Sequence, residues 1–330
     1  MNLNNRIDWI DCCKGFALLL VILGHNISLQ YQFERFLTQL IYSFHMPLFF
    51  ILSCITFKFS PDIKAFIKRT FKSFKHLIFP AVMIYVLSIF YLFCDNSASQ
   101  RIVWKYQIDR FIYASGCRFE IRPCLGMTWF LFVLFFGRTI LDLLQIYLKK
   151  KSLIFVVFLC YLVGILLQNC WYFFSIDVTL AMMPFFYFGY ILKKWDINYK
   201  TAPTLFTSLL GFIYFFIITN EQIFFIPCRS YPQIPLCYLL GILGTLSLCC
   251  LFQILLKSNK MTLLLYLGRN ALTLFMIHAL DYTYSPLYNI TANNIINGIC
   301  RIIIDISVLL LLRGCKIFVQ SFSLLKSDNL

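Results

Sequence analysis

Apolar stretches long enough to cross a lipid bilayer follow one another along almost the whole of this 330-residue chain. A helix needs roughly 20 residues to span the hydrocarbon core. Ten stretches approach that length: residues 12–30, 36–57, 77–94, 127–148, 153–174, 176–192, 204–219, 234–256, 261–280 and 295–312. Because backbone amides in lipid must be hydrogen-bonded within the chain, each stretch predicts a helix. We therefore expect an all-α, polytopic membrane helix bundle with about ten transmembrane helices.

The composition indicates a membrane protein rather than a soluble one. Hydrophobic residues make up 60% of the chain, charged residues only 13%, and the mean hydropathy is +0.78. Soluble domains carry about 25% charged residues, so this chain would not stay in solution. No long polar stretch separates the apolar ones, and we expect a single integral-membrane domain over residues 1–330.

The positions of the basic residues predict the orientation in the membrane. If the amino terminus is cytoplasmic, 20 of the 29 lysines and arginines fall in cytoplasmic segments, and every cytoplasmic loop contains some of them. The positive-inside rule therefore predicts that both termini are cytoplasmic. Arg138, near the middle of the predicted span 127–148, is the one basic residue assigned to neither side. The net charge of +15 then reflects topology, and we expect no nucleic-acid partner.

The fourteen cysteines show no spacing that indicates a metal or redox site, so we expect no metal. Most of them lie inside predicted spans, where cysteine packs as a small apolar side chain. Only Cys117 and Cys124, in the predicted outer loop over residues 95–126, are placed to pair in an oxidising compartment. The first span starts at Asp11 and Lys14 and ends without an A-x-A cleavage site, so we expect it to be retained.

Three histidines lie inside predicted spans and are the leading candidates for function. Polar groups in lipid are costly, so they indicate a functional site unless they only bond a neighbouring helix. His25 and His45 lie at a similar predicted depth, roughly 9 to 14 Å below the outer surface at about 1.5 Å per helical residue. His278 lies near the outer end of its span. The three histidines could therefore face one cavity.

Charged residues also occur in pairs at helical spacing. Asp11 and Lys14 share a face at the cytoplasmic end of the first span, where an acid is favoured by the helix dipole and a lysine reaches the interface. Arg301 and Asp305 are four residues apart in the last span, and we expect them to pair with each other.

A basic face is predicted for the cytoplasmic segment after the second span. Its cations recur at spacings of one, three or four residues and are Lys64, Lys68, Arg69, Lys72 and Lys75. Such a face fits the positive-inside rule or contact with anionic lipid. It equally fits docking of a phosphate-rich soluble ligand, and the sequence leaves both interpretations open.

A series of motifs resembles the integral-membrane acyltransferase-3 family, particularly its sugar O-acetyltransferases. In chain order the motifs are RIDWIDCCKG (6–15), LVILGH (20–25), FHMPLFF (44–50), LIFP (77–80), TWFL (128–131), MPFFYFG (183–189), LGRNAL (267–272) and IH (277–278). They cover nearly the whole chain. The sequence departs from the family pattern at Cys54, where glycine is usual, and at Lys72, where the second of two paired arginines is usual.

The resemblance implies transfer of an acyl group, usually acetyl, from coenzyme A to a hydroxyl of a glycan. His25 is then the expected general base, and His45 would stabilise the oxyanion or orient the acceptor. Asp11 is a further candidate catalytic residue. It lies 14 residues before His25, about 21 Å along one helix, so the orienting partner of His25 must come from another helix. The expected phosphate-binding residues are Lys14, Lys68, Arg69 and Lys72.

The resemblance also implies the partners and the location. We expect cytosolic acetyl-CoA as the acyl donor, a glycan or lipid-linked sugar as the acceptor, contact with membrane lipid, and a multi-pass position in a cell membrane, namely a bacterial inner membrane. A homo-oligomer is possible. A transporter or flippase is the alternative, since buried histidines also occur in proton-coupled pathways. The sequence shows no inverted repeat that would support it.

Overall fold

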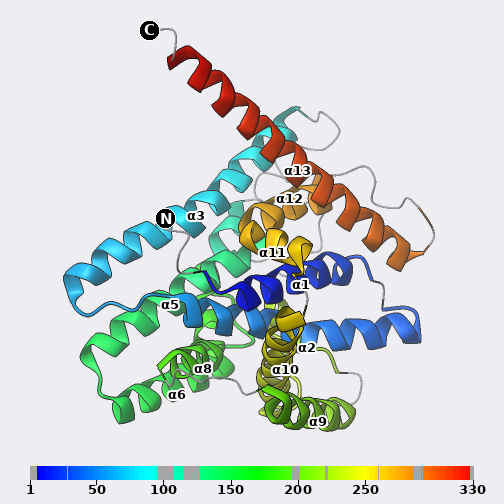
Figure 1. Ribbon diagram of the computed structural model, residues 1–330. Coiled ribbons are helices and arrows are strands. Elements are labelled where there is room, and N and C mark those ends of the chain that lie inside the picture. The colour runs from blue at the N-terminus through cyan, green and yellow to red at the C-terminus, as the bar shows by residue number, and fades with distance from the viewer. Residues whose placement is uncertain are drawn as a thin grey trace.

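The computed structural model describes residues 6–27, 29–94, 108–114, 126–194, 201–219, 222–258, 260–284, 291 and 293–327. Within them the chain is helical, with one isolated bridge between Phe225 and Ser230 (Figure 1). The helices are α1 (Asp8–Gly24), α2 (Gln32–Thr56), α3 (Ile63–Cys94), α5 (Trp129–Tyr147), α6 (Lys150–Leu166), α7 (Ile176–Ala181), α8 (Met183–Lys194), α9 (Thr201–Thr219), α10 (Leu236–Ser258), α11 (Thr262–Arg269), α12 (Ala271–Tyr284) and α13 (Asn294–Ser327). The predicted all-α class is confirmed.

The ten predicted stretches all coincide with helices, but not every one is a straight span. Among the described residues, α2, α3, α5, α10 and α13 are long and apolar enough to cross a membrane. Two bent pairs, α7 with α8 at 61° and α11 with α12 at 77°, raise the number of candidate spans to seven. The helices α1 and α6 have 17 residues each, and the apolar part of α9 covers only Ala202–Ile218. These three helices are therefore short for a membrane span.

Local chemistry explains both breaks. Pro184 lies in the first turn of α8, where its missing N–H removes a hydrogen bond that a continuous helix would need. At the other break, the Asn270 side chain donates to the Tyr266 carbonyl at 2.8 Å and so satisfies an acceptor at the end of α11. The predicted spans 176–192 and 261–280 are therefore each two helices.

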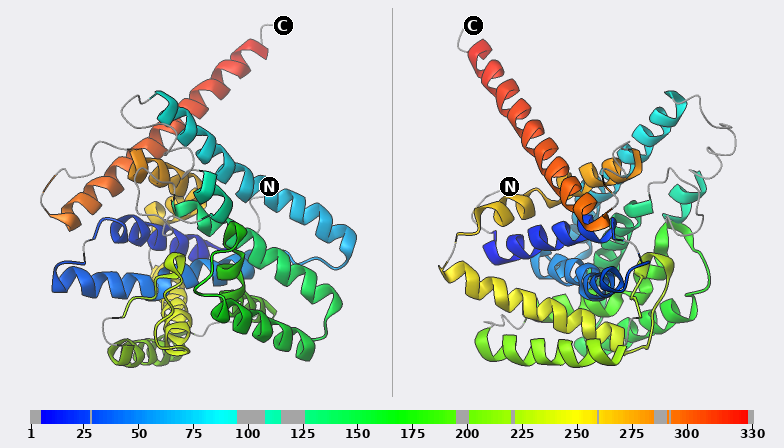
Figure 2. Two further views of the ribbon diagram at one scale, coloured as in Figure 1. Left: turned by 180° about the vertical axis from the view of Figure 1, so that it is seen from behind. Right: turned by 90° about the vertical axis from the view of Figure 1, so that its right-hand side faces the viewer.

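The helix α1 lies among α2, α10, α11, α12 and α13, all of which contact it. The approach of α1 to α11 is especially close, since a Cβ added at Gly15 would lie 2.4 Å from the Leu264 carbonyl oxygen. A Cβ at Gly268 would lie 1.7 Å from the Asp11 carbonyl oxygen. Only glycine allows this packing. Both views of Figure 2 show the last part of α13 extending away from the other helices.

Segments that the charge pattern assigns to the cytoplasm meet at one end of the bundle. Arg269 donates to Asp8 at 2.9 Å and joins α11 to the start of α1. Lys193 donates to the Phe57 carbonyl and joins α8 to the end of α2. Cys228, in a predicted outer segment, is disulfide-bonded, which fits an oxidising compartment. The prediction that only Cys117 and Cys124 are placed to form a disulfide is therefore wrong. These two cysteines lie outside the described residues, and the orientation stays a prediction from charge.

A buried ion pair holds the segment before α10 against α7. Arg229 donates to both carboxylate oxygens of Asp177, at 2.7 and 3.2 Å, and its guanidinium lies 3.7 Å from the centre of the Trp171 ring. Arg229 also donates to the Pro227 carbonyl at 2.8 Å. Such a bidentate pair fixes the geometry of both partners.

Replacing Asp177 with asparagine should destabilise the protein by about 3 to 5 kcal/mol, because it removes the negative charge from a buried bidentate ion pair. Thermal unfolding of the purified protein in detergent measures the change. The control is Asp62→Asn, which alters an exposed carboxylate that accepts from the Ala65 N–H at 2.7 Å at the start of α3. That change should cost at most about 0.5 kcal/mol, because the asparagine side-chain oxygen can still accept this hydrogen bond. Equal losses in the two variants would contradict the prediction.

Candidate active site

The half-buried His25 imidazole ends a chain of three side chains from three helices. His25 terminates α1, and its Nδ1 lies 3.1 Å from Nε2 of His278 on α12. Nδ1 of His278 lies 2.9 Å from Oδ2 of Asp305 on α13. The two imidazoles are stacked with an interplanar angle of 8°, and the side chains of His278 and Asp305 are fully buried. The prediction that His25 takes its partner from another helix is confirmed.

This chain of contacts determines which ring nitrogens carry a proton. An ionised carboxylate only accepts, so His278 carries its proton on Nδ1 and donates to Asp305. Nε2 of His278 then holds a lone pair and accepts from Nδ1–H of His25. The remaining nitrogen of His25, Nε2, therefore carries a lone pair. The hydrogen bond to His278 fixes the orientation of the His25 ring, so this lone pair is suited to accept a proton.

The predicted pair of Arg301 with Asp305 is wrong. Asp305 bonds His278, and Arg301 donates instead to Asp281 on α12 at 2.6 Å. Both residues lie on α13 where it packs against α12, and the neighbouring helix supplies a closer partner for each. Sequence spacing along α13 could not reveal this competition.

His45 lies on α2 and has a different hydrogen-bonding pattern. Its Nδ1 lies 2.7 Å from the Ile41 carbonyl one turn earlier, so Nδ1 is the donor and Nε2 holds the lone pair. The Tyr42 ring packs edge-on against it, with centroids 4.9 Å apart. In this neutral form His45 can accept a proton or hydrogen bond at Nε2 but cannot donate one there. The geometry favours orienting an acceptor hydroxyl over stabilising an oxyanion.

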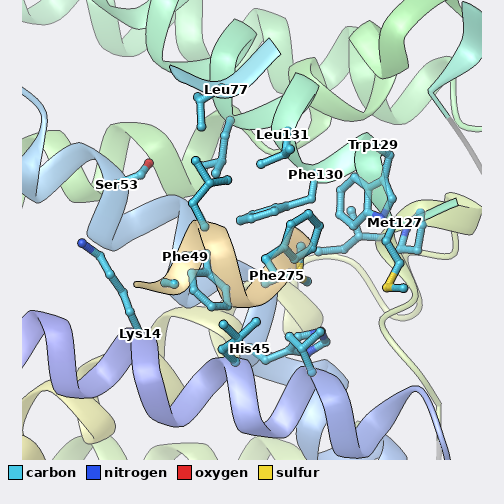
Figure 3. Close-up of a pocket in the computed structure, with 18 of the residues that line it drawn as sticks. Lys14, His45, Phe49, Ser53, Leu77, Met127, Trp129, Phe130, Leu131 and Phe275 are labelled. Atoms are coloured by element: carbon cyan, nitrogen blue, oxygen red, sulfur yellow. The ribbon is translucent and has the colours of Figure 1, made fainter. Parts of the chain in front are cut away.

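A cavity of about 200 Å³ connects the histidines with a polar end near the start of α1. His25, His45 and Tyr42 line one part of it, and Lys14 and Arg138 line another. Figure 3 shows Lys14 at one side and Met127 and Trp129 at the other, with the rings of Phe49, Phe130 and Phe275 between them. The walls between the two ends are mostly apolar. Of the three membrane histidines, His278 does not line the cavity and reaches it only through His25.

The predicted phosphate-binding residues do not all reach this cavity. Lys14 lines it, whereas Lys68, Arg69 and Lys72 do not. Nη1 of Arg69 donates to the carbonyls of Lys58 and Phe59 and lies 3.3 Å from Oγ of Ser60, so this guanidinium holds the loop after α2. Lys68 and Lys72 are exposed on α3.

The sequence reasoning missed two lining residues, Arg138 and His76. Arg138 on α5 donates to Oγ of Ser73 on α3 at 3.0 Å and lies near the Phe57 ring. The available signal was its position near the middle of a predicted span, which left it on neither side of the membrane. His76 follows Lys72 by four residues on α3, which places the two side chains on one face. These residues make the polar end of the cavity more basic than Lys14 alone.

Asp11 lies at the other end of α1 from His25 and is not brought near His25 or His45. Its carboxylate lies 3.8 Å from Lys14 Nζ and 3.8 Å from Arg269 Nε. With Asp8, these residues form an ionic cluster where α1 meets α11. Asp11 therefore contacts Lys14 and can orient it, but it does not contact His25.

His278, Asp281 and Asp305 each offer a ligand atom within 4.8 Å of the others. This is a spacing that could hold a metal ion. In the structure, however, Asp281 bonds Arg301, and His278 bonds Asp305 directly. The Asp281 carboxylate is thus already bonded to a guanidinium, and the Asp305 carboxylate to an imidazole.

Comparison with protein families identifies the class of enzyme. The model of the family described as "Acyltransferase domain" matches residues 7–312. The chain belongs to the acyltransferase-3 family. The matched range contains every residue of the Asp305–His278–His25 chain and the whole lining of the cavity. Comparisons with curated proteins and with solved structures find no match. The protein is therefore a multi-pass membrane acyltransferase.

Proposed function

We propose that this acyltransferase moves an acetyl group from cytosolic acetyl-CoA to a hydroxyl of a cell-surface or lipid-linked glycan, with His25 as the general base. The observation that carries the proposal is the Asp305–His278–His25 chain, which ends at a cavity whose other end is basic. The basic end suits a phosphorylated donor, and the apolar walls suit its uncharged pantetheine arm.

The proposed reaction begins when Nε2 of His25 takes the proton of the acceptor hydroxyl. The hydroxyl oxygen attacks the thioester carbonyl carbon, and the tetrahedral intermediate collapses with cleavage of the C–S bond. The thiolate then receives the proton from His25, so the enzyme is restored and coenzyme A leaves. While His25 is protonated, its positive charge is shared through His278 with the Asp305 carboxylate, which lowers the cost of forming an imidazolium in a buried site.

The acceptor is proposed to enter at the histidine end. Phe225, Ile226 and Pro227 of the segment before α10 line the cavity there, and Arg229 anchors that segment to Asp177. His45, with its lone pair on Nε2, would accept a hydrogen bond from a second hydroxyl of the sugar. A cytosolic donor and an outer acceptor would then meet within one protein.

The function is tested in proteoliposomes that contain the purified protein. Acetyl-labelled coenzyme A is supplied on one side, and a glycan or lipid-linked sugar fraction on the other. The proposal expects label in an alkali-labile ester on the glycan and release of coenzyme A in equal amount. Movement of an unmodified glycan across the membrane without loss of label from acetyl-CoA would support the transporter alternative instead.

The donor site is tested by reversing one charge near the polar end of the cavity. Lys72→Glu should raise the KM for acetyl-CoA about tenfold with little change in kcat, because the added carboxylate repels the donor phosphates. Steady-state kinetics with varied acetyl-CoA measure the effect. The control is Lys64→Glu, which makes the same charge change two turns earlier on α3. A similar rise in KM in both variants would mean that net charge, and not a phosphate contact at Lys72, is responsible.

A further inference from the structure

A second cavity lies between α5, α6 and α8 and shares no residue with the one that contains His25. Its volume is about 230 Å³, and its lining includes Gln145, Lys150, Leu153, Tyr187, Tyr190 and Lys194. Three helices contribute to it, and the two lysines are exposed, so a ligand can reach them. Neither the proposed reaction nor the family match assigns a role to it.

The polar groups of this cavity fit an anion. Nζ of Lys194 lies 4.7 Å from the centre of the Tyr190 ring, and no carboxylate in the described part of the chain pairs with it. Lys150 is the first residue of α6 and lies on the same cavity. Tyr187 and Tyr190 add hydroxyl groups that can donate, whereas the Gln145 amide already donates to the Ser60 carbonyl. Two lysines together with two phenolic hydroxyls suit a phosphate.

The surroundings of the cavity fit a lipid rather than a soluble anion. Lys150 and Lys194 belong to segments that the positive-inside rule assigns to the cytoplasmic side. Ile154 and Phe158 follow Lys150 at intervals of four residues, so the three side chains lie along one face of α6. These two apolar side chains are 45% and 52% exposed, on a helix that would face lipid. An apolar surface therefore runs from the basic cavity along α6 toward the membrane interior.

We propose that this cavity binds the phosphate headgroup of an anionic phospholipid of the cytoplasmic leaflet. Lys150 and Lys194 hold the phosphate, and the acyl chains lie along Ile154 and Phe158. A basic pocket between helices at the cytoplasmic surface is a known way to bind anionic headgroups. The bound lipid also contacts Tyr190, which lines the cavity. The Tyr190 ring packs edge-on against Phe59 in the loop after α2, with centroids 4.8 Å apart.

The test uses native mass spectrometry of the purified full-length protein in detergent, titrated with phosphatidylglycerol or phosphatidylcholine. The wild type should retain phosphatidylglycerol in preference to phosphatidylcholine. The double variant Lys150→Gln with Lys194→Gln should bind phosphatidylglycerol about tenfold more weakly or worse. The matched control is Lys149→Gln with Lys151→Gln, which removes the same charge from neighbouring residues that do not line the cavity. Equal weakening in both double variants would overturn the proposal.

Two further measurements test where the phospholipid binds and whether coenzyme A competes for the same cavity. Ile191→Trp fills the cavity without changing its charge, and it should also reduce retention of phosphatidylglycerol. Retention unchanged in this variant would overturn the assignment to the cavity. Addition of coenzyme A to the wild type tests the other source of phosphate, and phosphatidylglycerol should stay bound. Displacement of phosphatidylglycerol by coenzyme A would mean that the cavity takes the phosphates of the acyl donor, and would also overturn the proposal.

Discussion

The variant His25→Ala should transfer acetyl groups at least about 10²- to 10⁴-fold more slowly than the wild type, since that is the usual contribution of a positioned general base. The effect should fall on kcat, because the proposal assigns His25 to the proton transfer and not to binding of either substrate. Nε2 of His25 is the nitrogen that the hydrogen-bond chain leaves with a lone pair on the cavity. Release of coenzyme A, followed continuously with purified protein and a saturating glycan acceptor, measures the rate.

The matched control for this variant is the neighbouring residue. Asn26 donates from its side chain to the Ile22 carbonyl at 2.8 Å, so Asn26→Ala disturbs the same turn of α1 without removing an imidazole. Asn26→Ala should keep most of the activity. If His25→Ala retained full turnover, the base would have to be another group, with His45 as the next candidate because it lines the same cavity.

The second large effect is expected at Asp305, which touches no substrate and acts through His278. Asp305→Asn should lower kcat roughly 100-fold or more while leaving the KM for acetyl-CoA nearly unchanged. The amide carries no charge to stabilise protonated His25. When its NH₂ group faces His278, it also reverses the hydrogen-bond chain, so that Nε2–H of His278 donates to Nδ1 of His25. The proton of His25 then moves to Nε2, where the lone pair is needed.

The nearby residue Asp281 provides the comparison for Asp305. Asp281→Asn removes the same charge three residues from His278, but Asp281 bonds Arg301. This control variant should lose stability, because Arg301 is buried, yet the folded protein should keep a kcat close to that of the wild type. Equal losses of kcat in the two variants would show that general negative charge, and not the contact with His278, supports catalysis.

Several features of the fold could be predicted because they depend only on short stretches of sequence. The ten apolar stretches all became helices, since unpaired backbone groups in lipid leave no alternative. The spacing of Asp11 and His25 along one helix correctly excluded direct contact between them. The breaks near Pro184 and Asn270 were not predicted, because hydropathy records the apolar length of a segment and not the direction of its axis.

The sequence by itself determined the helical class, the family, and His25 and His45 as candidates. Only the tertiary structure decided that His278 bonds both His25 and Asp305. It also decided that Arg301 pairs with Asp281, and that Arg138 and His76 line the basic end of the cavity. The physical reason is that spacing fixes neighbours within one helix, whereas His25 and His278 are 253 residues apart. Their contact depends on how α1, α12 and α13 pack, and this packing depends on close helix contacts such as Gly15 against Leu264.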